Sequence, residues 1–184
     1  YIGIADPLRA TSAGAVARLK ARGIAVAMLT GDNRHVARNI AAQVGIERVL
    51  AEVLPQHKAE EVQRLQAERG AHVGMVGDGI NDAPALAAAD VSFAIGAGSD
   101  IAVEAADVVL VHGDLDGVAT AIDLSAATLR KIRQNLFFAF VYNVLGIPLA
   151  AFGLLNPVIA GAAMALSSVS VLGNSLLLNR WRPR

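Results

Sequence analysis

The stretch from Val76 to Pro84, Val-Gly-Asp-Gly-Ile-Asn-Asp-Ala-Pro, gathers polar groups that could bind a cation and a phosphate. Asp78 and Asp82 are four residues apart, with Asn81 between them. The glycines on each side of Asp78 let the backbone approach a ligand closely. Carboxylate oxygens suit Mg²⁺, which usually binds one or two carboxylates together with phosphate oxygens. A helix cap needs one Asp or Asn and not this cluster, so the stretch predicts a Mg²⁺ and phosphate site.

Three other polar segments could take part in phosphate chemistry, although each has a simpler explanation on its own. Thr30, Gly31 and Asp32 place a hydroxyl and free backbone N–H groups where a strand meets a helix, which suits an anion. The same residues commonly do no more than cap a helix. Lys58 begins a helix rich in glutamate, so it could be a solvated surface lysine. The segment 6–9, Asp-Pro-Leu-Arg, indicates little alone.

Short apolar runs alternate with helical patterns in the first 111 residues. An unbroken apolar run such as that from Ile24 to Leu29 is typical of a parallel strand buried on both faces. The alternation predicts an α/β fold with a parallel, Rossmann-like sheet and right-handed crossovers. The polar segments follow strands, at the carboxyl edge where such sheets bind ligands. We expect strands at 1–5, 24–29, 49–51, 72–76, 91–95 and 108–111, and helices at 11–22, 34–44, 56–69, 84–89 and 99–105.

Charge divides the 184 residues at about Ser125. All 16 acidic residues precede it and six of the 16 basic residues follow it, so the first part carries a net charge of −6 and the last part +6. The basic ends are not interleaved with stacking aromatic residues, which argues against a nucleic acid partner. No cysteine is present, which excludes disulfides and thiolate metal sites within these residues.

Two uncharged runs, 136–155 and 158–178, each have about the length of ~20 residues that a helix needs to cross a bilayer. Only Asn156 and Pro157 separate them, so they predict a helical hairpin. A buried hairpin in a soluble core is the alternative, but two such runs exceed what a small core needs. Basic residues flank both outer ends, and Trp181 suits an interfacial anchor, so we expect the α/β domain on the cytoplasmic side. The expected boundaries are 1–114 for the α/β domain, 115–134 for a connecting helix, and 135–155 and 157–179 for the membrane helices.

Together the motifs resemble the phosphorylation domain of P-type ATPases, within the haloacid dehalogenase-like superfamily. The resemblance rests on segments 6–9, 30–33, 55–58, 77–84, 98–102 and 104–107, of which 77–84 is highly specific. It implies phosphoryl transfer from ATP to an aspartate, followed by hydrolysis. It also implies that Asp78 holds Mg²⁺ with support from Asp82, and that Thr30, Lys58 and Asn81 contact the transferring phosphoryl group. A lysine, a hydroxyl and Mg²⁺ supply what such a transfer needs, which is mainly positioning and neutralisation of charge on oxygens.

The family's nucleophile lies in an Asp-Lys-Thr-Gly-Thr motif on the central strand of the sheet, and this sequence has no such motif. The family also has a nucleotide-binding domain, an actuator domain and earlier membrane helices. Tyr1 opens directly on an apparent strand. We therefore expect the carboxy-terminal part of a longer enzyme, with the central strand missing and no ATPase turnover of its own.

Polar groups inside a spanning helix are costly, so they are candidates for function. The first run carries Tyr142 and Asn143, and the second carries Met164 and Ser168 on one helix face. A thioether is a soft donor that selects Cu(I) over hard cations. The alternative is that the serines and small residues merely allow close helix packing and that the methionine only faces lipid. The pattern resembles the copper-transporting subgroup, whose Cys-Pro-Cys motif lies outside these residues. Zinc and cadmium relatives have an acidic residue in the final helix, which is absent from this sequence, whereas silver is not separable from copper.

The leading hypothesis is an ATP-driven Cu(I) exporter of the plasma (inner) membrane, of which this chain is a part. The alternatives are a membrane-tethered phosphatase of the same superfamily and a truncated, non-catalytic protein that only binds partners or Mg²⁺. The phosphatase needs its own aspartate nucleophile, and the missing motif counts against it. The cofactors implied are Mg²⁺ and ATP, the latter bound mainly by the missing domain. The expected partners are the rest of the polypeptide, the lipid bilayer and, as a candidate, a copper chaperone.

Overall fold

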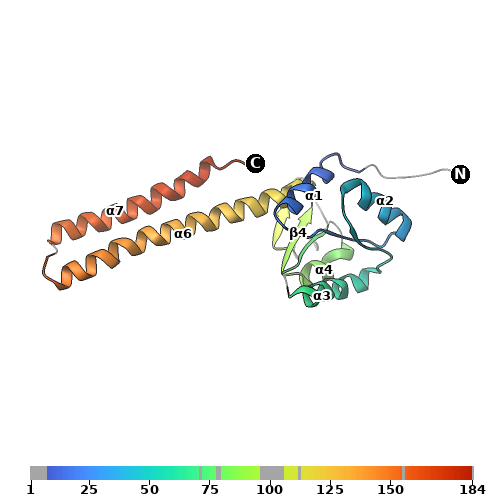
Figure 1. Ribbon diagram of the computed structural model, residues 1–184, viewed down its shortest axis with the longest axis horizontal. Coiled ribbons are helices and arrows are strands. Elements are labelled where there is room, and N and C mark those ends of the chain that lie inside the picture. The colour runs from blue at the N-terminus through green and yellow to red at the C-terminus, as the bar shows by residue number, and fades with distance from the viewer. Residues whose placement is uncertain are drawn as a thin grey trace. The chain divides into compact units, whose positions relative to one another are not determined.

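The computed structural model describes residues 8–70, 72–77, 80–95, 106–111, 113–154 and 156–183, apart from the side chains of Arg69 and Ile80. The chain forms two compact units, residues 1–119 and 120–184. Figure 1 shows the first as strands surrounded by short helices and the second as two long helices running side by side. The two units are taken in turn.

The first unit alternates strands and helices as the sequence predicts. Three expected elements lie outside the described residues or partly so: the strand at 1–5, the Asp-Pro-Leu-Arg segment at 6–9 and the helix at 99–105. The helices are α1 (Ser12–Ala21), α2 (Arg34–Val44), α3 (Lys58–Arg69) and α4 (Ala83–Ala88), with 3₁₀ turns η1 (Pro55–His57) and η2 (Ile80–Asp82) before the last two. The strands are β1 (Ala27–Leu29), β2 (Arg48–Leu50), β3 (Gly74–Gly77), β4 (Val91–Ile95) and β5 (Val108–Leu110).

The described strands form two parallel sheets, as expected for a parallel sheet whose central strand is missing. β1 pairs with β2, and β3, β4 and β5 pair in that order. No described strand pairs with the second edge of β1 or of β3. The expected strand at 24–29 is therefore shorter, since β1 can form a ladder only over the three residues that β2 offers.

Helix α2 shows how local sequence sets these elements. Its N-cap is Asn33, whose side chain accepts a hydrogen bond from the backbone N–H of Val36 at 2.9 Å. Its C-cap is Gly45, which has the left-handed φ of 76° that glycine adopts without strain. Ala37 and Ala41, four residues apart, are buried on one face. Cap residues and apolar spacing together fix both ends of the helix and its orientation.

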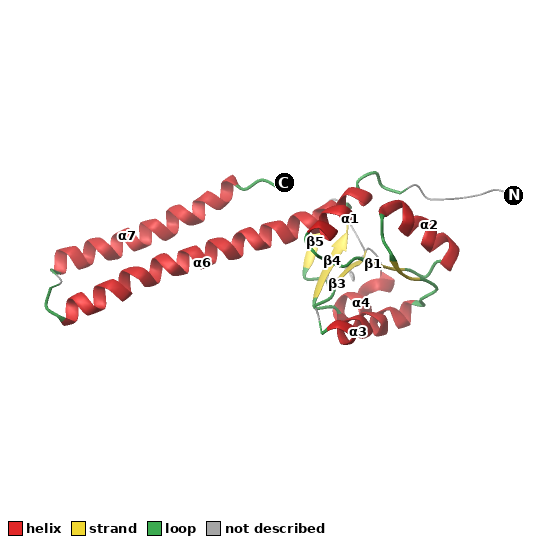
Figure 2. Cartoon of the chain, in the orientation of Figure 1, coloured by secondary structure: helices red, strands yellow, loops and turns green. Residues whose placement is uncertain are grey.

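A small apolar core joins helices to strands in the first unit. Val62 of α3, Met75 of β3 and Leu86 of α4 are buried together, and Leu29 of β1 packs against them. Helices α1 and α2 pack with each other, as do α3 and α4. Figure 2 shows the two pairs on opposite sides of the strands, which gives a three-layer α/β arrangement.

Two carboxylates join neighbouring strands at the amino edge of the second sheet. Asp90, just before β4, accepts hydrogen bonds from the backbone N–H of Val73 at 2.7 Å and from Gln66 at 2.9 Å. The backbone bond from Val73, then Gln66 and His72, lowers the pKa of Asp90 to about 2. Asp107, just before β5, accepts from the Ser92 hydroxyl at 2.8 Å and from its N–H at 2.9 Å, and the same bonds lower its pKa. These carboxylates hold the strands in register.

The second unit contains most of α6 (Asp116–Ala151) and all of α7 (Pro157–Leu176), followed by η3 (Leu177–Arg180). Helix α6 is continuous across residues 134 and 135, where we expected a connecting helix to give way to a membrane helix. It ends at a turn in which Gly153 has a φ of 69°, and Asn156 then caps α7 by accepting from the N–H of Val158. Both helices are long and apolar enough to cross a membrane, and neither has its apolar stretch buried. Large apolar side chains are exposed along both, among them Phe137, Phe140, Val144, Leu145, Ile147, Val158, Ile159, Val169 and Leu172.

Candidate functional site

Lys58 and Asp82 form an ion pair where α3 and α4 begin. Lys58 is the first residue of α3, and Asp82 closes η2 directly before α4. The Lys58 Nζ and Asp82 Oδ1 atoms are 2.6 Å apart, with the two side chains only 15% and 13% exposed. The turns η1 and η2 pack against each other, which brings the two residues together from 24 positions apart. Because water is largely excluded, each charge acts on the other, or on a ligand, more strongly than at the surface.

Gly77, the last residue of β3, makes room for this pair. A Cβ atom at Gly77 would lie 2.8 Å from the Cβ of Asp82 and 3.0 Å from its Oδ2. The sequence led us to expect that the glycines beside Asp78 admit a ligand, whereas Gly77 admits the Asp82 side chain itself. Asp78 and Gly79 lie outside the described residues, so the Mg²⁺ role of Asp78 stays a prediction.

The loop after β1 is a second polar feature. The Thr30 hydroxyl donates to Asp32 Oδ2 at 2.9 Å and accepts from the Asp32 N–H at 3.1 Å. The helix-cap explanation for this loop applies to Asn33, which caps α2, and not to Thr30. Asp32 and Gly31 are exposed, so the loop is open to solvent at the carboxyl end of β1. It offers a hydroxyl beside the beginning of a helix.

A neighbouring segment, which was not identified from the sequence, holds this loop in place through hydrogen bonds. The Glu52 N–H donates to the Asp32 carbonyl at 2.9 Å, and the Val53 N–H donates to the Thr30 carbonyl at 3.1 Å. Glu52 has a φ of 62°, and it is the non-glycine residue with a positive φ in the described chain. Its carboxylate also accepts from the Arg34 N–H at 3.4 Å. A glutamate in left-handed geometry carries strain, and no sequence pattern marks such a position in advance.

The predicted site residues thus fall into two groups. Lys58 contacts Asp82, while Thr30, Gly31 and Asp32 form their own loop, and within the described residues no hydrogen bond joins the two groups. Asn81 is exposed beside Asp82. No group of three acidic or histidine side chains in the described part of the chain is placed to hold a metal. Asp82 nevertheless fits Mg²⁺ as a single ligand, because this ion takes few carboxylates and completes its shell with phosphate and water oxygens.

Three of the four residues predicted to bind a transported ion are exposed on α6 and α7. Tyr142 is half-buried, but Asn143, Met164 and Ser168 are exposed, and the Met164 side chain is 72% exposed. Asn143 and Ser168 each donate to a carbonyl of their own helix, at 2.8 and 3.3 Å. The two helices therefore do not enclose a metal site by themselves, and its remaining donors would have to come from elsewhere.

Comparisons with known proteins show which proteins this chain is similar to. Residues 1–90 match the haloacid dehalogenase-like hydrolase family. Over 180 residues, 98% of the chain, it is 59% identical to the "Probable copper-exporting P-type ATPase V" of Mycobacterium tuberculosis (strain ATCC 25618 / H37Rv), of which it covers 23%. It is 57% identical over 97% of its length to the "Probable copper-importing P-type ATPase A" of Enterococcus hirae, of which it covers 25%. The chain thus spans about a quarter of the length of these relatives.

The fold is that of a solved relative from the same group of pumps. A zinc-transporting PIB-type ATPase matches 94% of the chain with a TM-score of 0.86 and 39% identity, and the chain covers 28% of that structure. This match spans both the parallel α/β unit and the two apolar helices. The chain therefore carries a haloacid dehalogenase-like domain, and over nearly its whole length it is similar to heavy-metal P-type ATPases.

Proposed function

We propose that this chain is the carboxy-terminal part of an ATP-driven Cu(I) pump that works through an aspartyl-phosphate intermediate. The shielded Lys58–Asp82 pair carries this proposal, because it places a cation and a carboxylate together at the carboxyl edge of a parallel sheet. Phosphoryl transfer depends on neutralising the oxygens of the moving group, and a lysine with restricted access to water is suited to that task.

Each described residue then has a defined task. Asp82 holds the Lys58 ammonium in place while the site awaits a phosphoryl group, after which the ammonium binds phosphoryl oxygens. The Thr30 hydroxyl turns its one O–H from the Asp32 carboxylate to the same phosphoryl group, while it still accepts from the Asp32 N–H. Glu52 and Val53 fix the loop that carries Thr30. Mg²⁺, when bound by Asp78 with Asp82 in support, supplies further positive charge to the phosphate oxygens.

The aspartate nucleophile is proposed to lie on a strand that pairs with both β1 and β3. The open edges of these two strands, and the packing of Leu29 of β1 against the core around Met75 of β3, support that position. ATP would be bound mainly by a domain outside these residues. On this proposal the isolated chain has no turnover.

Cu(I) is the proposed cargo. The exposed Met164 thioether is a soft donor, and Asn143 and Ser168 are exposed with it, which suits a site completed by other helices of the same protein. The absence of an acidic residue after Asp123 disfavours zinc as cargo, although the solved structural relative transports zinc. The proposed direction of transport is export, because similar proteins are named as copper-exporting ATPases. The basic flanks of the hairpin support a cytoplasmic position for the α/β unit, the side from which a copper chaperone would deliver its ion.

The cargo is tested by Met164→Leu in the full-length protein, since this change keeps the size of the side chain and removes the sulfur. We expect Cu(I)-stimulated phosphorylation by ATP to fall. Leu172→Ala, at another exposed apolar position of α7, is the control and should leave it unchanged. Unaltered Cu(I) stoichiometry and turnover in Met164→Leu would refute the assignment.

The phosphate site is tested separately by Asp78→Ala, which should abolish Mg²⁺-dependent formation of the phosphoenzyme. Normal phosphoenzyme levels at ordinary Mg²⁺ concentrations would reject this role. Lys58→Gln is expected to lower phosphorylation at every Mg²⁺ concentration, because the lysine acts on the phosphoryl group and not on the ion.

A further inference from the structure

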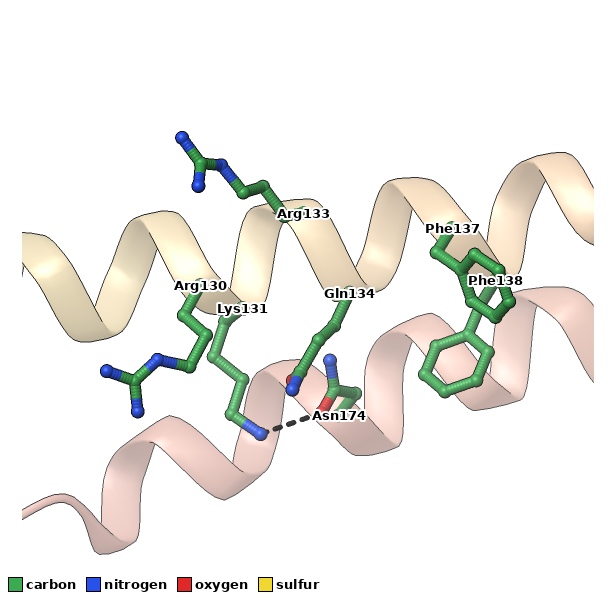
Figure 3. Close-up of a pocket in the computed structure, with 7 residues that line it drawn as sticks. All are labelled: Arg130, Lys131, Arg133, Gln134, Phe137, Phe138 and Asn174. Atoms are coloured by element: carbon green, nitrogen blue, oxygen red, sulfur yellow. Dashed lines mark hydrogen bonds between the residues drawn. The ribbon is translucent and has the colours of Figure 1, made fainter.

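A pocket of about 470 Å³ opens between α6 and α7, away from the residues proposed to bind Cu(I). It combines cations, amides and aromatic rings, and Figure 3 shows it in close-up. Its lining residues are Arg130, Lys131, Arg133, Gln134, Phe137, Phe138 and Asn174.

Along α6 the lining side chains change from charged to aromatic in the order of the sequence. Arg130, Gln134 and Phe137 stand at spacings of four and three residues, so they share one face of the helix. The step from Arg130 to Phe137 is about 10 Å along the axis at ~1.5 Å per residue. Phe137 and Phe138 meet edge to face with ring centroids 5.9 Å apart, at the start of the uncharged run. The pocket is therefore cationic at one end and aromatic at the other.

A hydrogen-bond network between the helices fixes the walls of this pocket. Lys131 Nζ donates to Asn174 Oδ1 at 2.7 Å, and Asn174 Nδ2 donates to Asn135 Oδ1 at 2.8 Å. Asn135 in turn donates to the Ser175 hydroxyl at 2.8 Å. An ammonium has three N–H donors, so Lys131 keeps two for a ligand. Figure 3 shows Arg130, Lys131 and Gln134 directed toward α7.

All charged side chains after Asp123 are basic. The 61 residues after Asp123 contain six basic side chains and no acidic one. In the described chain neither Arg130 nor Arg133 forms an ion pair. Cations at this position, next to an apolar helical run, lie at the depth of lipid phosphates when the helices span a bilayer.

We propose that the pocket binds the headgroup of an anionic phospholipid. Arg130 and Lys131 contact the phosphate, and Arg133 adds positive charge at the same end of the pocket. Gln134 donates to the headgroup or glycerol oxygens, and the two phenylalanines pack against the first acyl carbons. A soluble phosphate would use only the cationic end, and an acidic protein surface would not enter a pocket that extends beside the apolar run. The aromatic end is what selects a lipid. The inference rests on the proposed insertion of α6 and α7 in a bilayer.

The experiment uses the full-length protein in nanodiscs of phosphatidylcholine containing spin-labelled phosphatidylglycerol or spin-labelled phosphatidylcholine. Electron paramagnetic resonance gives the fraction of each lipid that is immobilised by the protein. We expect phosphatidylglycerol to be preferred several-fold. One basic residue near an anionic surface contributes a factor of roughly five, so Arg130→Gln with Arg133→Gln should remove most of this preference.

The matched control is Arg180→Gln with Arg182→Gln, which removes the same charge at the same open end of the hairpin, beyond α7, but touches none of the lining residues. Retained preference in this control supports a site, whereas an equal loss in both double variants would mean general surface attraction and overturn the proposal. Absence of any preference in the wild type would overturn it as well. Displacement of the lipid by millimolar glycerol 3-phosphate would assign the pocket to a soluble anion instead.

Insertion and pumping are measured on the same samples. Incorporation into nanodiscs tests the membrane assignment, and Cu(I)-stimulated phosphorylation tests the proposed function. Lipid preference that disappears in the Arg130 and Arg133 variant while the protein still inserts therefore reports on the pocket alone.

Discussion

The tightest contact at the proposed phosphate site gives a quantitative prediction for Gly77→Ala. The added methyl group would lie 2.8 Å from the Asp82 Cβ, whereas carbon atoms in favourable contact are ~3.5–4.0 Å apart. Asp82 must therefore move by about 1 Å, and its 2.6 Å bond to Lys58 Nζ would exceed hydrogen-bonding distance. Overpacking of this kind costs about 1–3 kcal/mol.

Gly74→Ala is the matched control, because it makes the same change in the same strand. A Cβ at Gly74 would meet the Val91 carbonyl at 3.7 Å and Phe93 at 3.9 Å, which are ordinary contacts. Replacing glycine where the new side chain fits stabilises a protein by about 0.4–1 kcal/mol, through the unfolded chain. The two variants should therefore differ in sign.

Hydrogen exchange followed by mass spectrometry on the full-length protein measures the local effect. Gly77→Ala should speed exchange in peptides covering α4 by roughly 5- to 150-fold, as expected for 1–3 kcal/mol, while Gly74→Ala leaves it unchanged or slower. Wild-type protection in Gly77→Ala would refute the packing of Asp82 against Gly77. Equal loss in both variants would show that β3 needs glycine for another reason.

Three further predictions concern other parts of the chain. The pKa of Asp90 is lowered from 3.8 to about 2, so the stabilisation that its carboxylate provides is complete above pH 4 and is lost as the pH falls toward 2. An NMR titration of this carboxyl group should have its midpoint near 2, and a midpoint near 4 would contradict the hydrogen bond from Val73. Glu52→Gly relieves a left-handed φ and should raise stability to thermal inactivation by about 1 kcal/mol, and a fall in that stability would contradict the strain inferred at this position. Asn174→Leu removes two interhelical bonds, worth about 0.6 kcal/mol each in a membrane, and should lower the melting temperature in detergent more than Asn179→Leu does.

The sequence was sufficient for features that depend on near neighbours. Asn33 and Gly45 mark the ends of α2 because a cap acts within one turn. The strand beginning at Ile24 was overestimated, since strand length depends on a pairing partner far away in the sequence. The gap between the two sheets was expected because the Asp-Lys-Thr-Gly-Thr motif of the central strand is missing. That expectation rests on the resemblance to a family and not on a local sequence pattern.

The residues of the site could be predicted from the sequence, but the contacts between them could not. The types of Lys58 and Asp82 suggested phosphate chemistry, yet only the packing of η1 on η2 shows that they bind each other. The brace at Glu52 could not be foreseen, because a glutamate gives no sign of left-handed backbone geometry. The hydrogen bonds between Lys131, Asn135 and Asn174 depend on the pairing of two helices that no local pattern specifies.

Four aspartates of the α/β unit are divided between the two edges of its strands. Asp32 and Asp82 follow strands β1 and β3, whereas Asp90 and Asp107 precede strands β4 and β5 and hold backbone N–H groups. A library of variants scored for both protein abundance and copper tolerance of the host should therefore separate by edge. Substitutions at Asp90 and Asp107 would reduce the number of molecules, while those at Asp32 and Asp82 would leave inactive molecules at normal abundance. Whether a carboxylate precedes or follows its strand thus predicts whether its substitution lowers the abundance of the protein or its activity.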